Sequence, residues 1–250
     1  MTGHHAADRD RRRFLQLAGL GALALAVRPD RVHAQTTASP LKIGSVGAGR
    51  MGSALGELFI KAGYPVMFSS RHPDTLKDLA ARLGPLASVG TVDQAIAFGE
   101  VVVMVVPYTA LEEIGKAHGP ALASKPLVLD ICNPIARRDG DALVKWVNEQ
   151  GGAGLASAKL LPGAKIVRAF NAISYRKVVG DAHRTPTLVG VPIAGDDPKA
   201  IALAEQIIRK MGFDPVLVGN LAMGKYLVPG TPLAEEHSAA EIRQIAATLH

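Results

Sequence analysis

The stretch that decides the fold is Leu41-Lys42-Ile43-Gly44-Ser45-Val46-Gly47-Ala48-Gly49-Arg50-Met51-Gly52. A short apolar run meets three glycines spaced G-x-G-x-x-G, and the following residues predict a helix from Arg50 to Ala62. Strand, tight turn and helix in this order form the context in which the glycine pattern indicates dinucleotide binding. An ordinary strand–helix turn is the alternative interpretation of the glycines alone.

Each glycine of the turn has a distinct expected role. Gly47 allows the sharp turn, Gly49 lets the backbone approach a pyrophosphate, and Gly52 lets the helix pack closely on the strand. The N–H groups at the helix start, together with the positive end of its dipole, then favour an anion. The predicted pyrophosphate-binding residues are Gly47, Ala48, Gly49, Arg50, Met51 and Gly52.

The end of the second expected strand, Tyr64 to Phe68, distinguishes NAD from NADP. An NAD site usually places an acidic residue here for the ribose 2′-hydroxyl, whereas NADP requires a cation for its 2′-phosphate. This chain continues Ser69-Ser70-Arg71-His72, with no acid before Asp74. Ser70 and Arg71 therefore predict NADP, since a guanidinium binds phosphate in a bidentate manner. His72, next to Arg71, is expected to contact the adenosine phosphate. The alternatives are a solvated Arg71 that pairs with Asp74 or Asp78, and a His72 that is an ordinary exposed loop residue.

Apolar runs and helical patterns alternate along the rest of the chain. Residues 101–106 are nearly all β-branched, as expected of a strand covered by helices on both faces, and the end Val106-Pro107 is expected to face the cofactor. Further strands are expected at 86–89, 127–131, 165–170, 187–191 and 214–218, and further helices at 75–83, 91–98, 109–118, 141–150, 155–161, 199–211 and 235–249. The alternation predicts an α/β fold, a Rossmann-like doubly wound parallel sheet with a small carboxyl-terminal α/β extension.

We expect an NADP-binding Rossmann domain at residues 41–135, and a carboxyl-terminal part at 136–250 that completes the sheet and the acceptor site. Residues 1–34 read as a cleaved twin-arginine signal peptide. Arg11-Arg12-Arg13 precedes an apolar run to Val27, and Val32-His33-Ala34 fits a signal peptidase site. Residues 35–40 read as a linker. An amphipathic first helix is the alternative. The signal predicts a periplasmic or secreted protein and the twin-arginine export machinery as a partner of the precursor.

Composition narrows the class of partner. The formal net charge is +6, but the first 34 residues hold six arginines against three aspartates, and the remainder is nearly neutral. Aromatic residues make up 4% of the chain. Neither feature is typical of a nucleic-acid-binding protein. The single cysteine, Cys132, cannot form an internal disulfide and is expected to be a buried structural thiol, with a reactive thiol as the alternative.

The sequence also lacks several kinds of site. It contains no paired metal-ligand spacing, no G-x-S-x-G elbow and no Walker loop. We therefore predict no metal site and no side chain that acts as a catalytic acid, base or nucleophile. Hydride transfer onto a flavin-like ring requires mainly the alignment of two rings, which agrees with this absence.

Several segments together resemble the NADPH-dependent coenzyme F420 (deazaflavin) oxidoreductases, including the reductase domains of metalloreductases. They are residues 47–52, 68–71, 105–108, 133–134, 169–173 and 192–197. The resemblance implies that Pro107, Asn133, Asn171, Ala172 and Ile173 border the nicotinamide and the acceptor ring. For Asn133 and Asn171 the alternative is a structural amide. This chain departs from the family at Tyr108, where tryptophan is frequent.

The resemblance implies an oxidoreductase that transfers hydride between NADP(H) and an acceptor, either a deazaflavin coenzyme or FMN/FAD. Two other readings stay open: a flavin-mediated reductase of ferric or cupric chelates, and a non-catalytic NADP-binding protein. A homodimer is the assembly that the resemblance suggests.

Overall fold

The computed structural model describes residues 40–249. The predictions of a signal peptide at residues 1–34 and of most of the linker lie outside these residues. Within the described part of the chain, no helix is both long and apolar enough to cross a bilayer.

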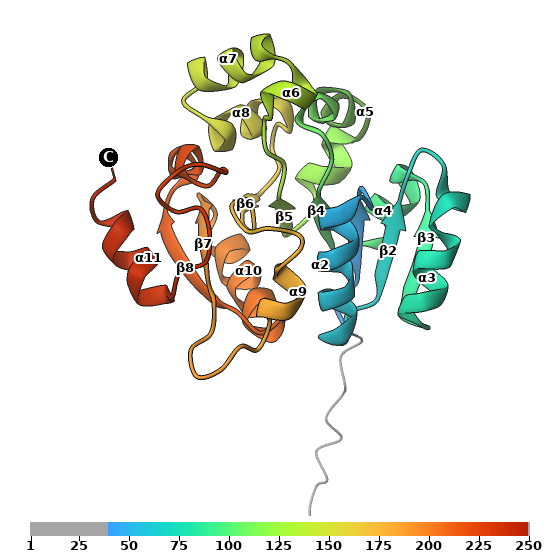
Figure 1. Ribbon diagram of the computed structural model, residues 1–250. Coiled ribbons are helices and arrows are strands. Elements are labelled where there is room, and N and C mark those ends of the chain that lie inside the picture. The colour runs from blue at the N-terminus through green and yellow to red at the C-terminus, as the bar shows by residue number, and fades with distance from the viewer. Residues whose placement is uncertain (1–39, 250) are drawn as a thin grey trace, which may run out of the picture. The chain divides into compact units, whose positions relative to one another are not determined.

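A single eight-stranded sheet forms the centre of residues 40–249, with the strand order β3-β2-β1-β4-β5-β6-β7-β8 (Figure 1). The strands are β1 Ile43–Val46, β2 Val66–Ser69, β3 Ala87–Gly90, β4 Val101–Met104, β5 Leu127–Asp130, β6 Ile166–Arg168, β7 Gly190–Gly195 and β8 Asp214–Gly219. Strands β1 to β6 are parallel. The predicted Rossmann-like doubly wound fold is confirmed.

The carboxyl-terminal strands depart from a fully parallel arrangement. Strand β7 runs antiparallel to β6, and β8 runs parallel to β7. The strand expected at residues 187–191 lies at Gly190–Gly195 instead, so that prediction of its bounds was wrong. Pro192 is tolerated inside this strand because β6 pairs only with Ala194 and Gly195, which leaves the rest of that edge of β7 without a ladder to β6.

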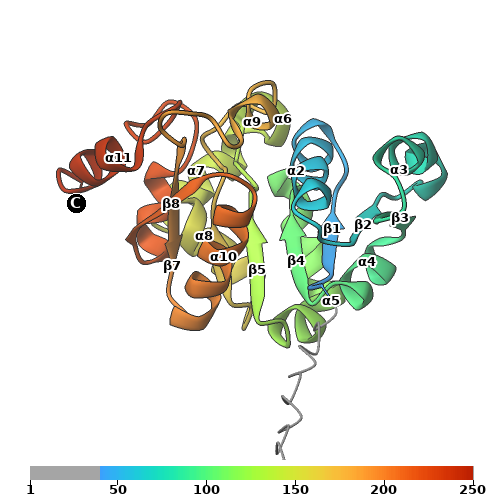
Figure 2. The ribbon, with the colours of Figure 1, turned by 90° about the horizontal axis from the view of Figure 1, so that it is seen from below.

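Helices cover both faces of the sheet. They are α2 Arg50–Lys61, α3 Lys77–Leu83, α4 Val92–Phe98, α5 Leu111–Ala123, α6 Ala136–Asp139, α7 Asp141–Glu149, α8 Ala153–Leu160, α9 Val178–Asp181, α10 Pro198–Lys210 and α11 Ala239–Ala246. Three short 3₁₀ helices are η1 Pro73–Leu76, η2 Tyr108–Ala110 and η3 Leu221–Tyr226. Helix α3 lies beside β3 and α11 beside β8, at opposite ends of the sheet (Figure 2).

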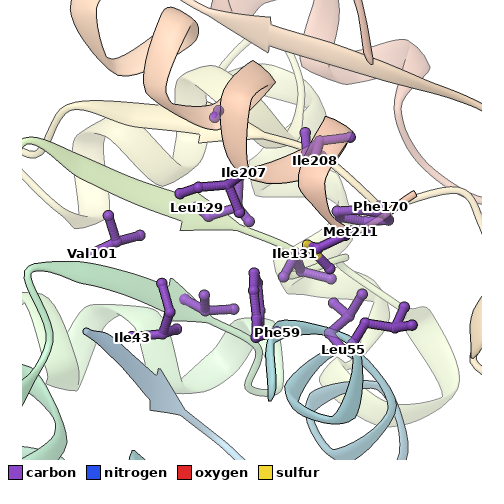
Figure 3. Packing of buried hydrophobic residues seen from close by; sticks show 14 of the residues in the cluster. Ile43, Leu55, Phe59, Val101, Leu129, Ile131, Phe170, Ile207, Ile208 and Met211 are labelled. Atoms are coloured by element: carbon purple, nitrogen blue, oxygen red, sulfur yellow. The ribbon is translucent and has the colours of Figure 1, made fainter. Parts of the chain in front are cut away.

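The side chains of β4 alternate between two hydrophobic clusters of the core. Val101 and Val103 belong to the cluster that contains α2 and α10, whereas Val102 and Met104 belong to the cluster that contains α5 and α8. In the first cluster, Phe59 of α2 and the isoleucines of α10 meet strand residues such as Leu129 (Figure 3). Each such buried side chain stabilises the fold by about 1.5–3 kcal/mol. The core thus fixes the strand ends that carry the site.

Local sequence signals set several helix ends. The Thr91 side chain and Gln94 form a capping box at α4, as expected from the threonine at that position. Asp197 accepts a hydrogen bond from the Ala200 N–H at the start of α10. The terminal helix begins at Ala239 and not at the expected residue 235, because Ser238 is its capping residue. Helix α5 runs to Ala123, beyond its expected end at residue 118.

Candidate functional site

A cleft of about 820 Å³ lies at the carboxyl ends of β1, β2 and β4. This edge is where doubly wound sheets bind their ligands. Seven of the residues predicted from sequence line it: Gly47, Ala48, Gly49, Ser70, Arg71, Val106 and Pro107. The structure therefore brings the glycine turn, the end of the second strand and the end of β4 together around one space.

The glycine turn needs glycine at two of its positions for steric reasons. Gly47 has φ +106°, and a Cβ there would lie 2.5 Å from the carbonyl oxygen of Val105. At Gly52 a Cβ would lie 2.6 Å from the carbonyl oxygen of Gly47, so α2 could not pack against the turn. The hydroxyl of Ser45 donates to the Gly47 carbonyl at 2.8 Å, and Ser53 donates to the Ala48 carbonyl at 2.9 Å. The turn is therefore held in one conformation.

Gly49 differs because, apart from its chain neighbours, no protein atom lies within 4 Å of the place its Cβ would take. It lines the cleft and is also the N-cap of α2, where no side chain caps the helix and no acid lies in the first turn. The N–H groups at this helix start are thus available to an anion. An open backbone at an uncapped helix start fits the pyrophosphate of a dinucleotide.

Ser70 and Arg71 lie on the wall of the cleft that follows β2. The Ser70 hydroxyl accepts a hydrogen bond from the His72 N–H at 3.1 Å, which shapes this loop. Asp74 pairs with Lys77 at 2.6 Å, so it is not the partner of Arg71. In the described part of the chain Arg71 makes no ion pair, and its exposed guanidinium is free to bind a phosphate. His72 is not among the residues that line the cleft.

Part of the opposite wall was not predicted from sequence. Ala110, Glu113, Ile114, Ala117 and His118 share one face of the η2–α5 segment and line the cleft. Their spacing of three and four residues is the signal that could have identified this face. The Nδ1 atom of His118 lies 3.4 Å from Oδ1 of Asp93 on α4, which links the two helices at this wall.

A second group of predicted residues meets at the ends of β5 and β6. The Asn133 side chain donates to the carbonyl oxygen of Asn171 at 2.5 Å, and the Asn171 side chain donates to the carbonyl oxygen of Asp130 at 3.1 Å. Asn171, Ala172 and Ile173 line a separate small cavity of about 10 Å³. Both asparagines thus make the structural amide contacts that were the alternative interpretation, while they also stand at the predicted edge of the sheet.

A buried charged pair supports this second group. Arg168 donates to Oδ2 of Asp130 at 2.6 Å and to Oδ1 of Asn133 at 3.1 Å, and its side chain is fully buried. The guanidinium also donates to the carbonyl oxygens of Cys132 and Leu227. It therefore orients the Asn133 amide and joins β5, β6 and the segment after η3.

Two neighbouring side chains point into the core. Cys132 is buried, and burial together with the Asp130 charge raises the pKa of its thiol well above the usual value, as expected of a structural cysteine. Tyr108 is fully buried, and its hydroxyl donates to the carbonyl oxygen of Ala153 at 2.7 Å. Burial raises the pKa of this phenol. The position that departs from the family motif therefore packs against α8.

Within residues 40–249, no three His, Cys, Asp or Glu side chains come together in a way that could hold a metal ion. Two expectations from the sequence, that the protein has no metal site and no catalytic acid, base or nucleophile, stay predictions.

Comparison with known proteins gives a family match. Residues 42–134 match the model of the NADP oxidoreductases that are coenzyme F420-dependent. Metalloreductase STEAP3 of Rattus norvegicus is 29% identical over 190 residues, which are 74% of this chain and 35% of that protein. The chain thus spans about a third of the length of this curated relative. The predicted resemblance is confirmed, and the family match supports the assignment of NADP as the cofactor.

Solved structures show the same fold. A hypothetical protein, SMa0349, from Sinorhizobium meliloti is 24% identical with a TM-score of 0.65, over 80% of this chain and 95% of that one. A candidate F420-dependent NADP-reductase from Arthrobacter sp. FB24 is 21% identical with a TM-score of 0.63, over 74% of this chain and 87% of that one.

Proposed function

We propose, from the coenzyme F420-dependent NADP oxidoreductase family that residues 42–134 match, that this protein transfers a hydride between NADP(H) and a flavin-like or deazaflavin acceptor. The observation that carries the proposal is the single cleft shared by the glycine turn, Arg71 and the end of β4. A dinucleotide bound along this edge of a doubly wound sheet directs its nicotinamide toward the switch point between β1 and β4.

The residues of the chain would bind and orient the nucleotide. The uncapped start of α2 at Gly49 would hold the pyrophosphate, and Arg71 with Ser70 would hold the 2′-phosphate. Pro107 and Asn133 would border the nicotinamide. The nucleotide supplies the hydride itself, so the contribution of the protein is alignment of two rings and exclusion of water.

Oxidation of NADPH, measured with each acceptor separately, tests the proposal. The acceptors are a deazaflavin coenzyme, FMN, FAD and ferric chelates, each assayed with NADPH and with NADH. The proposal requires turnover with a ring acceptor and a preference for NADPH. Tight NADP binding without turnover of any acceptor would refute it and favour the non-catalytic NADP-binding alternative.

The similarity to a metalloreductase favours a second candidate, reduction of ferric or cupric chelates through a flavin. This reaction requires the chelate to be reduced only when a catalytic amount of flavin is present. Reduction of ferric chelate without flavin, or failure of reduction with flavin, would contradict this candidate.

We also propose export through the twin-arginine pathway, supported by Arg11-Arg12-Arg13 and the apolar run that follows. This pathway carries folded proteins and would allow NADP to be loaded before export. Changing Arg11 and Arg12 both to lysine is expected to retain the precursor in the cytoplasm, as measured by fractionation. Unchanged export of this double variant would contradict the proposed twin-arginine route.

A further inference from the structure

A half-buried aromatic ring that two arginines contact borders the candidate site. Tyr175 lies with its ring centroid 5.5 Å from Cζ of Arg50 and 5.4 Å from Cζ of Arg176. Arg50 also donates from Nη1 to the Tyr175 hydroxyl at 3.2 Å. Two guanidinium groups are thus held against the same half-buried ring, although they come from positions 126 residues apart in the sequence.

The two arginines are not neutralised by acids. Among residues 40–249, neither Arg50 nor Arg176 forms an ion pair. The nearby Glu236 is shared by Lys177 at 2.5 Å and Arg184 at 2.8 Å, so this carboxylate is already engaged by two other cations. Like charges held at one ring repel each other, and an anion that binds both guanidinium groups would relieve that repulsion.

The chain places this cluster beside the expected position of the acceptor. Arg50 directly follows Gly49 of the cleft, and Tyr175 lies two residues beyond Ile173 of the predicted acceptor edge. Helix α2, which begins at Arg50, packs against α9, which begins just after Arg176. The cluster is therefore at the rim between the glycine turn and the residue 171–173 turn.

We propose that Arg50, Tyr175 and Arg176 form a subsite for the phosphate on the side chain of the hydride acceptor. The inference rests on the proposed function and specifies its substrate class: a ring acceptor that carries a phosphate. Guanidinium groups match phosphate geometry through paired N–H donors. Contact with the Tyr175 ring holds both guanidinium groups in place before the ligand binds, which lowers the entropy cost of ordering them on binding.

The test compares FMN with riboflavin, which differ by one phosphate. Fluorescence titration of the full chain saturated with NADP⁺ gives a Kd for each flavin without requiring turnover. We expect the wild-type protein to bind FMN about tenfold more tightly than riboflavin. Arg176→Gln is expected to reduce this ratio to about twofold, mostly through weaker FMN binding, with the Kd of NADP⁺ unchanged.

Arg184→Gln is the matched control, since it makes the same charge change in the same region but removes an arginine already paired with Glu236. It should leave the ratio of the two Kd values near that of the wild type. The subsite would be overturned if Arg176→Gln weakened the binding of FMN and riboflavin equally. It would also be overturned if Arg176→Gln and Arg184→Gln changed the ratio of the two Kd values equally.

The remaining outcomes separate this inference from the proposed function. Wild-type protein that binds the two flavins equally, or binds neither, overturns the subsite. A weaker Kd of NADP⁺ in Arg176→Gln also overturns it, because that arginine would then serve the nucleotide pyrophosphate. A phosphate-dependent ratio without oxidation of NADPH would support the subsite and refute hydride transfer. Turnover of riboflavin and FMN with equal efficiency, together with equal Kd values, would support hydride transfer and overturn the subsite.

Discussion

Arg168 and Asp130 are cross-strand neighbours on β6 and β5, and their side chains form an ion pair at 2.6 Å with no solvent exposure on either side. The two side chains also hold neighbouring segments of the chain in place. Asp130 accepts a hydrogen bond from the Cys132 N–H at 2.8 Å, and Arg168 reaches Asn133 and the Leu227 carbonyl. A buried ion pair is a weak source of net stability, but loss of one partner leaves an uncompensated charge in the interior.

We therefore predict that Arg168→Met lowers the free energy of unfolding by about 3–5 kcal/mol, because it leaves the Asp130 carboxylate buried and unpaired. Urea denaturation measures the loss. Asp130→Asn combined with Arg168→Met should cost clearly less than the sum of the two single variants, since the second change removes the orphaned charge. Additive losses would show that the two side chains do not act as a pair.

Arg71 is the expected determinant of NADP over NAD. Arg71→Ala removes the cation that lines the cleft beside Ser70 and should weaken NADPH binding by about 10- to 100-fold, while NADH changes by about twofold or less. Calorimetric titration with both nucleotides measures the difference. Arg82→Ala is the control, because Arg82 pairs with Glu57 and does not line the cleft. Equal losses for the two nucleotides would refute the 2′-phosphate role.

Changing Gly47 or Gly49 to alanine is expected to affect different properties: mainly the stability of the fold for Gly47, and mainly nucleotide binding for Gly49. Gly47→Ala should destabilise the fold by about 2 kcal/mol or more, because of the positive φ and the approach to the Val105 carbonyl. Gly49→Ala should lower the thermal midpoint of the nucleotide-free protein far less, since its Cβ meets no protein atom beyond its chain neighbours and only the N-cap preference for glycine over alanine is lost.

The same Gly49→Ala variant should weaken NADPH binding about tenfold or more, because the methyl group occupies space that the pyrophosphate requires. Differential scanning fluorimetry without nucleotide and a binding titration separate the two effects. Normal NADPH affinity in Gly49→Ala would contradict the placement of the pyrophosphate at this residue.

Much of the fold was predictable because its signals are local. The glycine turn, the β-branched run before Met104 and the caps Thr91 and Asp197 each act within a few residues, and all lie where they were expected. Strand β7 was placed too early because Thr187 and Leu188 have strand-like composition. Its actual bounds depend on pairing with β8 from Gly190 to Ala194, which is a contact between distant segments.

The site was less predictable where it depends on contacts across the sheet. Arg168 lies in a short apolar strand, and no local pattern indicates that Asp130 is its partner. The contacts of Arg50 and Arg176 with the Tyr175 ring likewise require α2 and the loop after β6 to be neighbours. The residue types at the ends of strands follow from the sequence pattern, whereas the choice of hydrogen-bond partners and of ligand-facing side chains depends on contacts between distant segments.

Asp181 is a buried carboxylate that the fold accommodates poorly. It ends α9, where the helix dipole disfavours a negative charge, and its Oδ2 has no hydrogen-bond partner among the described residues. Burial, and then the charge of Glu236, raise the pKa of Asp181. A raised pKa means that the folded state prefers the protonated acid, so the ionised form destabilises the protein at every pH above that pKa.

Asp181→Asn is therefore expected to stabilise the protein by about 1 kcal/mol at pH 7, because the neutral amide avoids the buried charge. The advantage over the wild type should shrink as the pH falls through the raised pKa, and should vanish below the ordinary pKa of about 4, where both side chains are neutral. Urea denaturation between pH 7 and pH 4 measures the trend. Asp78→Asn, at an exposed position of α3, is the control and should change stability by less than about 0.5 kcal/mol. An advantage of Asp181→Asn that stays constant or grows toward acid pH would show that the ionised carboxylate is not the source of the strain.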